Sequence, residues 1–428
     1  MAIPEGAMGR GAEYRGYEAL LELADKEAGD PSVLGWDADR MRNLLEDLGS
    51  PQRTLRCTLV SGSKGKGSTA QLLDAMLRAA GRRTGLYTQP HLHRYAERVV
   101  CDGQALESEV SRRGLAEVLR RSRGPVTAFE ASTAFALWQF ARMGCQEAIL
   151  EAGFGGAMDA TAAADPALVL LGPVEREHTE VFGPCLEDVA AAEAGLLMAG
   201  RRCLAGAQSP PVSAVFRARA AETGTPYTEV APAEGSPGRF VLRTPGGVQV
   251  RGALGLGGQY QLDNVALAAA AAEALGCDSA AIRRGAREAH LPGRYETVAR
   301  CPHVLVDGAH TPGSAAALCR SLRRERPAKT ALVVGMLADK DPVGFCQALC
   351  PVTDGLWAVG AGDSRGLDPR VISEAAIAAG CGPVAVVDTV EGAVREAAAF
   401  VGAGGRVVVC GSFRVVAQAR VAFGLAPR

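Results

Sequence analysis

At 428 residues the chain is longer than one hydrophobic core usually organises, so we expect two domains. Lysine and arginine total 46 against 47 acidic residues, and this balance gives no field that would attract nucleic acid or a membrane surface. Residues 1–14 lack the apolar stretch of a signal peptide, and the alanine-rich run from Val265 is broken at Glu273, too early to span a bilayer. We therefore expect a cytoplasmic protein without nucleic-acid or membrane partners.

Apolar runs that end in glycine-rich turns alternate with helical patterns along most of the chain. The first run, 56–60, precedes a glycine turn and then apolar residues at helical spacing from Ala70 to Leu77. Further buried strands are predicted at 147–150, 167–171, 304–306, 330–334, 355–359, 383–387 and 406–410. This alternation is typical of βαβ units, so the sequence predicts an α/β fold with a mostly parallel sheet.

The pattern changes between residues 224 and 258. Short segments rich in Gly, Pro, Thr and Val, such as 239–244 before Pro245-Gly246-Gly247, predict a small β-rich insert of antiparallel hairpins. A helix is predicted over 264–275, and a new strand–helix alternation follows residue 294. We place the domain boundary near residue 297, with domains at 1–297 and 298–428.

The twelve cysteines are scattered and include no C-x-x-C pair. Several lie in apolar runs, as Cys410 does, so we interpret them as buried and reduced. Cys346 and Cys350 are one helical turn apart and could form half of a metal site, but no second pair of ligands accompanies them. Core packing is the favoured interpretation.

A glycine-rich segment lies between the first predicted strand and its helix. Its residues are Gly62, Ser63, Lys64, Gly65, Lys66, Gly67, Ser68 and Thr69. Glycines let backbone amides approach phosphate oxygens, the helix N-terminus and a lysine favour negative charge, and a hydroxyl can hold magnesium. The segment departs from the generic G-x-x-x-x-G-K-[ST] pattern because Gly67 follows Lys66 and position 60 is Val. The alternative is a simple strand–helix turn, but two of only five lysines fall here, which favours binding of ATP phosphates.

The same segment resembles the G-T-N-G-K-G-S loop of the folylpolyglutamate and dihydrofolate synthases, a family of the Mur ligase superfamily. Other motifs of that family are matched in collinear order at Leu86–Leu92 with Glu97–Arg98, Leu150–Gly156, Asp159–Thr161, Glu177–Glu180 with Gly183, Gln261 with Asn264, Leu291–Arg294, Val306–His310, Gly335–Asp341 and Gly411–Phe413. The match extends from about residue 36 to the C-terminus. So many motifs in order make chance a remote explanation.

The resemblance implies a Mur-type N-terminal ATPase domain, a smaller Rossmann-like C-terminal domain and an active site between them. It implies ATP and Mg²⁺ as cofactors, with a monovalent cation as a further candidate. The substrates would be a pteroate- or folate-like acid and L-glutamate, joined through an acyl phosphate. The family also implies a monomer.

Residue roles follow from the same resemblance. Lys66 and Ser68 would bind phosphates and magnesium, and Glu151 and His178 would ligate magnesium. Asn264 would contact adenine, and Asp307 would contact the nucleotide. Arg294 and His310 would approach the γ-phosphate or the acyl phosphate. Considered alone, His178 could be an ordinary surface or core histidine and Glu151 a strand-end cap.

Several positions depart from the family pattern. Gln89 replaces a metal-binding serine, although its amide oxygen could still be a ligand. Glu193 replaces a lysine that becomes carbamylated, and it keeps the negative charge on a shorter arm. Other replacements are Lys64, Ala157, Ala162 and Thr311. These changes indicate either a retuned enzyme or lost activity.

Three hypotheses follow. The first is a folate ligase, with dihydrofolate synthase activity, folylpolyglutamate synthase activity or both. The second is a divergent Mur-type amide ligase for a non-folate acid. The third is a non-catalytic nucleotide-binding relative. We favour a ligase because a decayed site should lose its charged groups first, whereas Lys66, Glu151, His178, Arg294, Asp307 and His310 are retained. The predicted catalytic set comprises Lys66, Glu151, His178, Glu193, Arg294 and His310.

Overall fold

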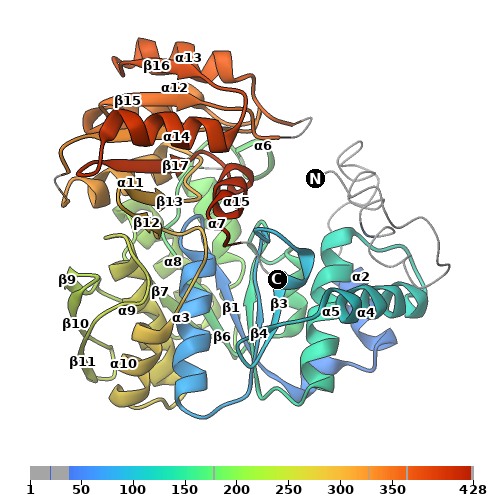
Figure 1. The fold of residues 1–428 in the computed structure, drawn as a ribbon. Helices are drawn as coiled ribbons and strands as arrows, with labels where there is room; N and C mark the ends of the chain where they lie inside the picture. Colours follow the sequence, from blue (N-terminus) through green and yellow to red (C-terminus); the bar gives the residue numbers. More distant parts are fainter. Residues whose placement is uncertain (1–19, 21–37, 177–178, 326, 363–364, 426–428) are drawn as a thin grey trace. The chain divides into compact units, whose positions relative to one another are not determined.

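The computed structural model describes residues 20, 38–176, 179–325, 327–362 and 365–425 (Figure 1). The chain divides into two compact units. The N-terminal unit contains the described residues up to Leu254 and Leu262–Ala289, and the C-terminal unit contains Gly255–Gln261 and the described residues from His290 onward. The boundary expected near residue 297 stays a prediction.

The N-terminal unit is built on a sheet with strand order β4-β3-β2-β5-β1-β6-β7-β8. The strands are β1 (Arg56–Ser61), β2 (Thr84–Tyr87), β3 (Val99–Cys101), β4 (Gln104–Ala105), β5 (Glu147–Glu151), β6 (Leu168–Leu171), β7 (Arg202–Ala205) and β8 (Tyr227–Glu229). All neighbours pair in parallel except at β3 and β4, which form the antiparallel edge. The carboxyl ends of the parallel strands therefore meet at one edge.

Helices connect these strands, and a separate three-stranded antiparallel sheet has the order β11-β10-β9. The helices are α2 (Ala38–Asp47), α3 (Lys66–Ala79), α4 (Ser108–Arg121), α5 (Ala128–Arg142), α6 (Thr179–Phe182), α7 (Leu186–Ala194), α8 (Pro210–Thr223), α9 (Gln261–Ala274) and α10 (Ser279–Glu288). Short 3-10 helices occupy Pro51–Thr54, Tyr95–Arg98 and Ala160–Ala164. The small sheet comprises β9 (Glu234–Ser236), β10 (Arg239–Arg243) and β11 (Gln249–Gly252).

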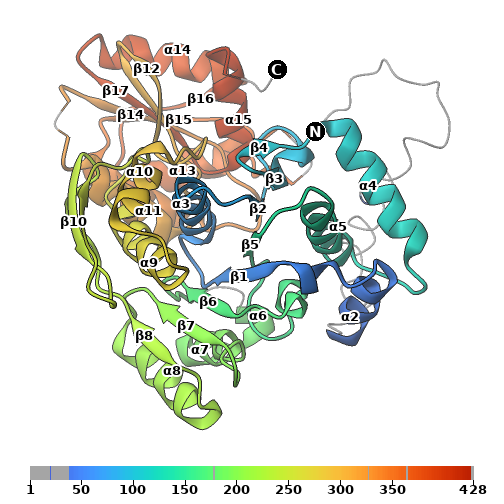
Figure 2. The same cartoon turned by 90° about the horizontal axis from the view of Figure 1, so that it is seen from below.

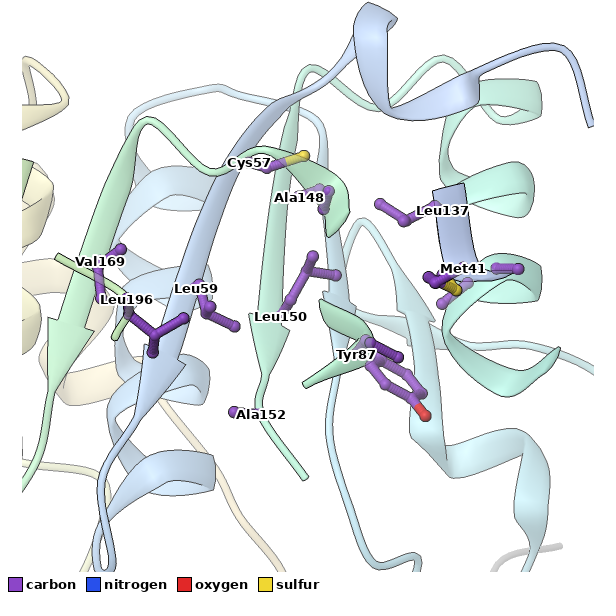
Figure 3. Packing of buried hydrophobic residues seen from close by; sticks show 14 of the residues in the cluster. Met41, Cys57, Leu59, Tyr87, Leu137, Ala148, Leu150, Ala152, Val169 and Leu196 are labelled. Carbon is purple, nitrogen blue, oxygen red and sulfur yellow. The ribbon is translucent and has the colours of Figure 1, made fainter. Parts of the chain in front are cut away.

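The N-terminal core follows from the period-2 alternation of the strands. Leu59 of β1, Leu150 of β5 and Val169 of β6 point to one face of the sheet, where they share a buried cluster with Met41 of α2 and Leu137 of α5 (Figure 3). Helix α3 packs against β1, β2 and β5, and Figure 2 shows α3 and α5 on either side of β5. The central strands are buried on both faces, which is why they read as continuous apolar runs.

The C-terminal unit contains a six-stranded sheet with the order β12-β13-β17-β14-β15-β16. Its strands are β12 (Glu296–Arg300), β13 (His303–Val306), β14 (Thr330–Val334), β15 (Gly355–Ala358), β16 (Val384–Val386) and β17 (Arg406–Cys410), and only β12 is antiparallel to its neighbour. Its helices are α11 (Pro312–Leu322), α12 (Pro342–Leu349), α13 (Pro369–Ala378), α14 (Val390–Val401) and α15 (Phe413–Ala422), with a 3-10 turn at Cys350–Val352. The predicted α/β fold with a separate C-terminal sheet is confirmed.

The region predicted as antiparallel hairpins is only partly so. Tyr227–Glu229 forms β8, which pairs in parallel with β7 at the edge of the main sheet. The ring of Tyr227 packs edge-on against Phe216 of α8, with ring centroids 6.2 Å apart. Pairing with β7 therefore places β8 on the main sheet, and the small antiparallel sheet begins at Glu234.

All twelve cysteines are free, and nine of them are buried, as expected. Cys185 and Cys301 are exposed, which corrects the expectation of burial for these two. Cys346 and Cys350 are not part of a metal-binding cluster within the described residues. Across the same parts of the chain, none of the helices combines the length and the apolar character needed to cross a membrane.

Candidate functional site

The loop between β1 and α3 requires glycine at two positions. Gly62 has φ +105° and Gly65 has φ +81°, conformations that residues with a β-carbon rarely adopt. A β-carbon at Gly62 would also lie 2.7 Å from the backbone oxygen of Gly172. The chain can therefore turn sharply from Ser61 into the first turn of α3 at Lys66, where backbone N–H groups are left for an anion.

Two side chains fix the path of this loop. The Lys66 ammonium donates a 2.7 Å hydrogen bond to the backbone oxygen of Gly62. The Ser63 hydroxyl accepts from the Glu175 N–H at 2.9 Å and donates to the Glu175 oxygen at 3.1 Å. The Lys64 N–H donates to the oxygen of Pro173, at 3.3 Å. Ser63 thus anchors the loop to the segment that follows β6.

Glu151 lies at the end of β5, next to the start of α3. A β-carbon at Gly67 would lie 3.2 Å from Glu151 Oε2, and the Gln89 N–H donates to the same oxygen at 2.9 Å. The Glu151 side chain is buried, as is that of Ser68, the residue after Gly67. A buried carboxylate at a helix N-terminus, near a serine hydroxyl, is a suitable start for a hard-cation site. Within the described part of the chain, the Gln89 Nε2 atom is buried without a hydrogen-bond partner.

Glu193 comes from the last turn of α7 and meets the start of the phosphate loop. Its Oε2 accepts from the Ser61 hydroxyl at 2.8 Å, and its Oε1 accepts from the Gly62 N–H at 3.3 Å. Burial raises the pKa of Glu193 to about 6, although the Ser61 hydroxyl and the Lys66 ammonium favour its ionised form and Asp159 opposes it. The structure thus directs Glu193 toward the backbone of the loop.

Asp159 is a residue to which the sequence analysis gave no role. Its Oδ2 accepts the consecutive N–H groups of Gly153, Phe154 and Gly155, and its Oδ1 accepts from the N–H of Thr161. This buried carboxylate therefore shapes the glycine-rich loop that follows Glu151. The three glycines within the four residues 153–156 were the available signal, because a tight loop needs an acceptor for its free N–H groups.

Asn264 lies in the first turn of α9 and faces the beginning of α3. A β-carbon at Gly65 would lie 2.2 Å from Asn264 Oδ1, and the Thr69 hydroxyl donates to the same oxygen at 3.4 Å. The N-terminal unit thus gathers the loop, Asn264, Glu151, Gln89 and Glu193. His178 lies outside the described residues.

In the C-terminal unit, Asp307 directly follows β13 and is almost fully buried. Its Oδ2 accepts from the Tyr260 hydroxyl at 2.7 Å and from the Tyr295 N–H at 2.8 Å, and its Oδ1 accepts from the Ala309 N–H at 2.8 Å. Burial and the Asp307 carboxylate raise the pKa of Tyr260 well above its usual value. Tyr260, which the sequence analysis missed, directly precedes Gln261 of the matched pair Gln261 and Asn264.

Arg294 and His310 lie close to Asp307 in the sequence and share Gly308 as a neighbour. The Arg294 guanidinium carbon lies 4.4 Å from the centroid of the Phe413 ring, a cation–π contact. A β-carbon at Gly308 would lie 2.7 Å from that ring and 3.1 Å from Arg294 Nη1. His310 Nδ1 lies 2.8 Å from the Gly308 oxygen. Glycine at 308 is therefore required by the Phe413 ring, over which the Arg294 guanidinium lies.

Comparison with known proteins places these features in a family. Residues 293–413 match the family described as Mur ligase, glutamate ligase domain. A relative from Halobacterium salinarum, named probable bifunctional folylpolyglutamate synthase/dihydropteroate synthase, is 35% identical over 401 residues, which cover 88% of this chain and 48% of that protein. The chain thus spans about half the length of the first curated relatives it matches.

The dihydrofolate synthase/folylpolyglutamate synthase of Escherichia coli is 32% identical over 375 residues, 84% of either chain. A crystal structure of the bifunctional folylpolyglutamate synthase/dihydrofolate synthase from Yersinia pestis, complexed with AMPPNP and Mn ion, superposes with a TM-score of 0.83 at 29% identity and covers 96% of this chain and 98% of that one. The chain therefore belongs to the dihydrofolate synthase/folylpolyglutamate synthase family.

Proposed function

We propose that the chain is an ATP-dependent amide ligase that joins L-glutamate to the carboxylate of a dihydropteroate or folate through an acyl phosphate. The observation that carries the proposal is the glycine loop at 62–65, with Lys66 and Glu151 beside it at the carboxyl edge of the sheet. Family membership supports the reaction type, and the names of the relatives supply the substrate class.

The N-terminal unit supplies the groups for the nucleotide. Backbone N–H groups at the start of α3 would hold the phosphates, and Lys66 would exchange its bond to Gly62 for the β- and γ-phosphate oxygens. Ser68 and Glu151 fit a magnesium ion because a hydroxyl and a buried carboxylate are hard oxygen donors beside the loop, and Gln89 is an additional candidate. Magnesium, when bound, would neutralise charge that develops on the transferred phosphoryl group.

The reaction then needs two displacements. The acid's carboxylate oxygen attacks the γ-phosphorus and ADP leaves; the glutamate nitrogen attacks the acyl carbon, inorganic phosphate leaves, and the nitrogen loses a proton. Lys66 would stabilise the first transition state, and the positive charge of Arg294 would stabilise the phosphoryl group of the acyl phosphate. Lys66 would leave its bond to Gly62 to do so, whereas Arg294 is held over the Phe413 ring.

Phosphate release by the purified chain tests the proposal. ATP and magnesium are supplied with dihydropteroate and glutamate in one reaction, and with tetrahydrofolate and glutamate in another, and products are identified by mass spectrometry. We expect phosphate release that requires both acid and amine, and a glutamylated product in at least one reaction. ATP binding without stimulated hydrolysis in either would contradict the folate reaction and would point to another acid or to a non-catalytic relative.

A further inference from the structure

The carboxylate of Glu193 is committed to the first residues of the phosphate loop. Each of its two oxygens accepts one hydrogen bond, from the Ser61 hydroxyl and from the Gly62 N–H. The side chain is 3% exposed, so these bonds are shielded from competing water. Helix α7 thus reaches the end of β1 across 132 residues of sequence.

The Gly62 residue is held from both sides. The Glu193 carboxylate accepts a hydrogen bond from the Gly62 N–H, and the Lys66 ammonium donates one to the Gly62 oxygen at 2.7 Å. The backbone of Gly172 blocks a third side, because a β-carbon at Gly62 would lie 2.7 Å from the Gly172 oxygen. The position of Gly62, where the loop starts, is therefore set by the Glu193 carboxylate, the Lys66 ammonium and the backbone of Gly172.

A second glycine-rich loop encloses Glu193 from the other direction. A β-carbon at Gly155 would lie 2.3 Å from Glu193 Oε1, and one at Gly156 would lie 2.7 Å from the Ala192 oxygen. Asp159 fixes this second loop through the N–H groups described above. The Glu193 carboxylate is consequently packed closely on this side, while it accepts hydrogen bonds from Ser61 and Gly62.

We propose that Glu193 is a positioning residue that holds the phosphate loop in its nucleotide-binding shape through these two hydrogen bonds, not through its negative charge. The role rests on the nucleotide-binding function proposed above. It differs from that of a metal ligand, for which the charge would be essential. Glutamine can make both contacts, since its oxygen accepts from Gly62 and its amide donates to the Ser61 hydroxyl.

The test compares Glu193→Ala, Glu193→Gln and Glu187→Ala in the full chain. Glu187 lies in the first turn of the same helix and is exposed, so it is a matched control. ATP binding is measured by calorimetry, first with EDTA and then with magnesium. In EDTA we expect Glu193→Ala to weaken ATP binding by about tenfold, the effect of losing one to two buried hydrogen bonds, and Glu193→Gln to stay within about threefold of wild type.

The outcomes separate the possible roles. If Glu193→Ala binds ATP with wild-type affinity, the positioning role is wrong. The role is also wrong if the ATP affinity of Glu193→Gln is as low as that of Glu193→Ala. If Glu193→Ala fails to fold, Ser61→Ala removes one of the two contacts, and we expect a loss of about threefold; unchanged affinity would count against the proposal. A wild-type chain that binds no ATP contradicts the nucleotide-binding function itself, a result distinct from any of these.

Discussion

Gly65 and Asn264 are in contact at a point where a side chain added to Gly65 would collide with the Asn264 amide. A β-carbon there would lie 2.2 Å from Asn264 Oδ1. The same oxygen accepts from the Thr69 hydroxyl, 195 residues away in sequence. The turn that begins α3 therefore rests on the first turn of α9, and the shape of the phosphate loop depends on a helix far along the chain.

Gly65→Ala should disrupt this contact, and Gly81→Ala is its matched control. The two glycines have nearly the same φ, +81° and +80°, but a β-carbon added at Gly81 would have no neighbouring atom within 4 Å. Backbone strain alone should cost both variants about 1 kcal/mol of unfolding free energy. Gly65→Ala should lose about 2 kcal/mol more and bind ATP at least tenfold more weakly. Urea unfolding and ATP titration check this; equal effects in both variants would refute it.

Lys66→Ala should lower kcat/KM about a hundredfold because one fixed positive charge is lost. This corresponds to a loss of about 3 kcal/mol of transition-state stabilisation. The fold should survive, since the Lys66 hydrogen bond to Gly62 is partly exposed and worth about 1 kcal/mol. Lys329→Ala is the control, because the Lys329 ammonium lies over the Phe400 ring, 4.4 Å from its centroid. In phosphate-release kinetics, Lys329→Ala should have the wild-type kcat/KM. A fully active Lys66→Ala would contradict the role of Lys66 in phosphate binding.

Glu151→Gln should raise the magnesium concentration needed for half-maximal activity by about tenfold or more, because a neutral amide is a poorer ligand than a carboxylate. The glutamine oxygen can still accept from the Gln89 N–H, so the local backbone should be kept. Activity is measured across a magnesium titration, with exposed Glu187→Gln as the control. An unchanged magnesium requirement would remove Glu151 from the metal site.

Asp307→Asn should destabilise the C-terminal unit more than Tyr260→Phe does. The asparagine amide cannot accept the hydrogen bonds that one carboxylate oxygen receives, so a buried N–H or hydroxyl loses its acceptor, at a cost of about 1–3 kcal/mol. Tyr260→Phe removes one donor and leaves the other two bonds to Asp307 in place, so its cost should be about 1 kcal/mol. Urea unfolding would reveal the order, and the reverse order would show that Asp307 does not organise this turn.

Glu193→Gln should become more stable relative to wild type as the pH rises from 5 to 7.5. The pKa of Glu193 is raised from 4.5 to about 6, so the folded chain binds this proton more tightly than the unfolded chain. The stability that this proton contributes is complete below pH 4.5 and is lost as the pH rises through 6, about 2 kcal/mol in all. Glutamine stays neutral and avoids the loss. Melting temperatures of both proteins across this range provide the check; a difference independent of pH would contradict the shifted pKa.

The sequence alone determined the fold class and most of the parallel strands. The runs at 330–334 and 406–410 are strands with those bounds, because a strand buried on both faces is a local, continuous apolar signal. The phosphate loop was equally local, since its glycines, lysine and hydroxyls lie within eight residues between one strand and one helix. Short or polar strands such as β12 carry a weaker signal and were not predicted.

Only the tertiary structure decided which distant groups meet within each unit. The hydrogen bond from Tyr260 to Asp307 spans 47 residues of sequence, and the one from Ser61 to Glu193 spans 132. The hydrogen bond from Thr69 to Asn264, which also contacts Gly65, spans 195 residues. The residues next to each of these side chains in sequence do not determine whether it faces solvent or a distant partner. A hydrogen-bond partner depends on the path of the whole chain, whereas a strand, a helix or a glycine turn depends on a few consecutive residues, and that is why the sequence determined the elements and the fold determined their contacts.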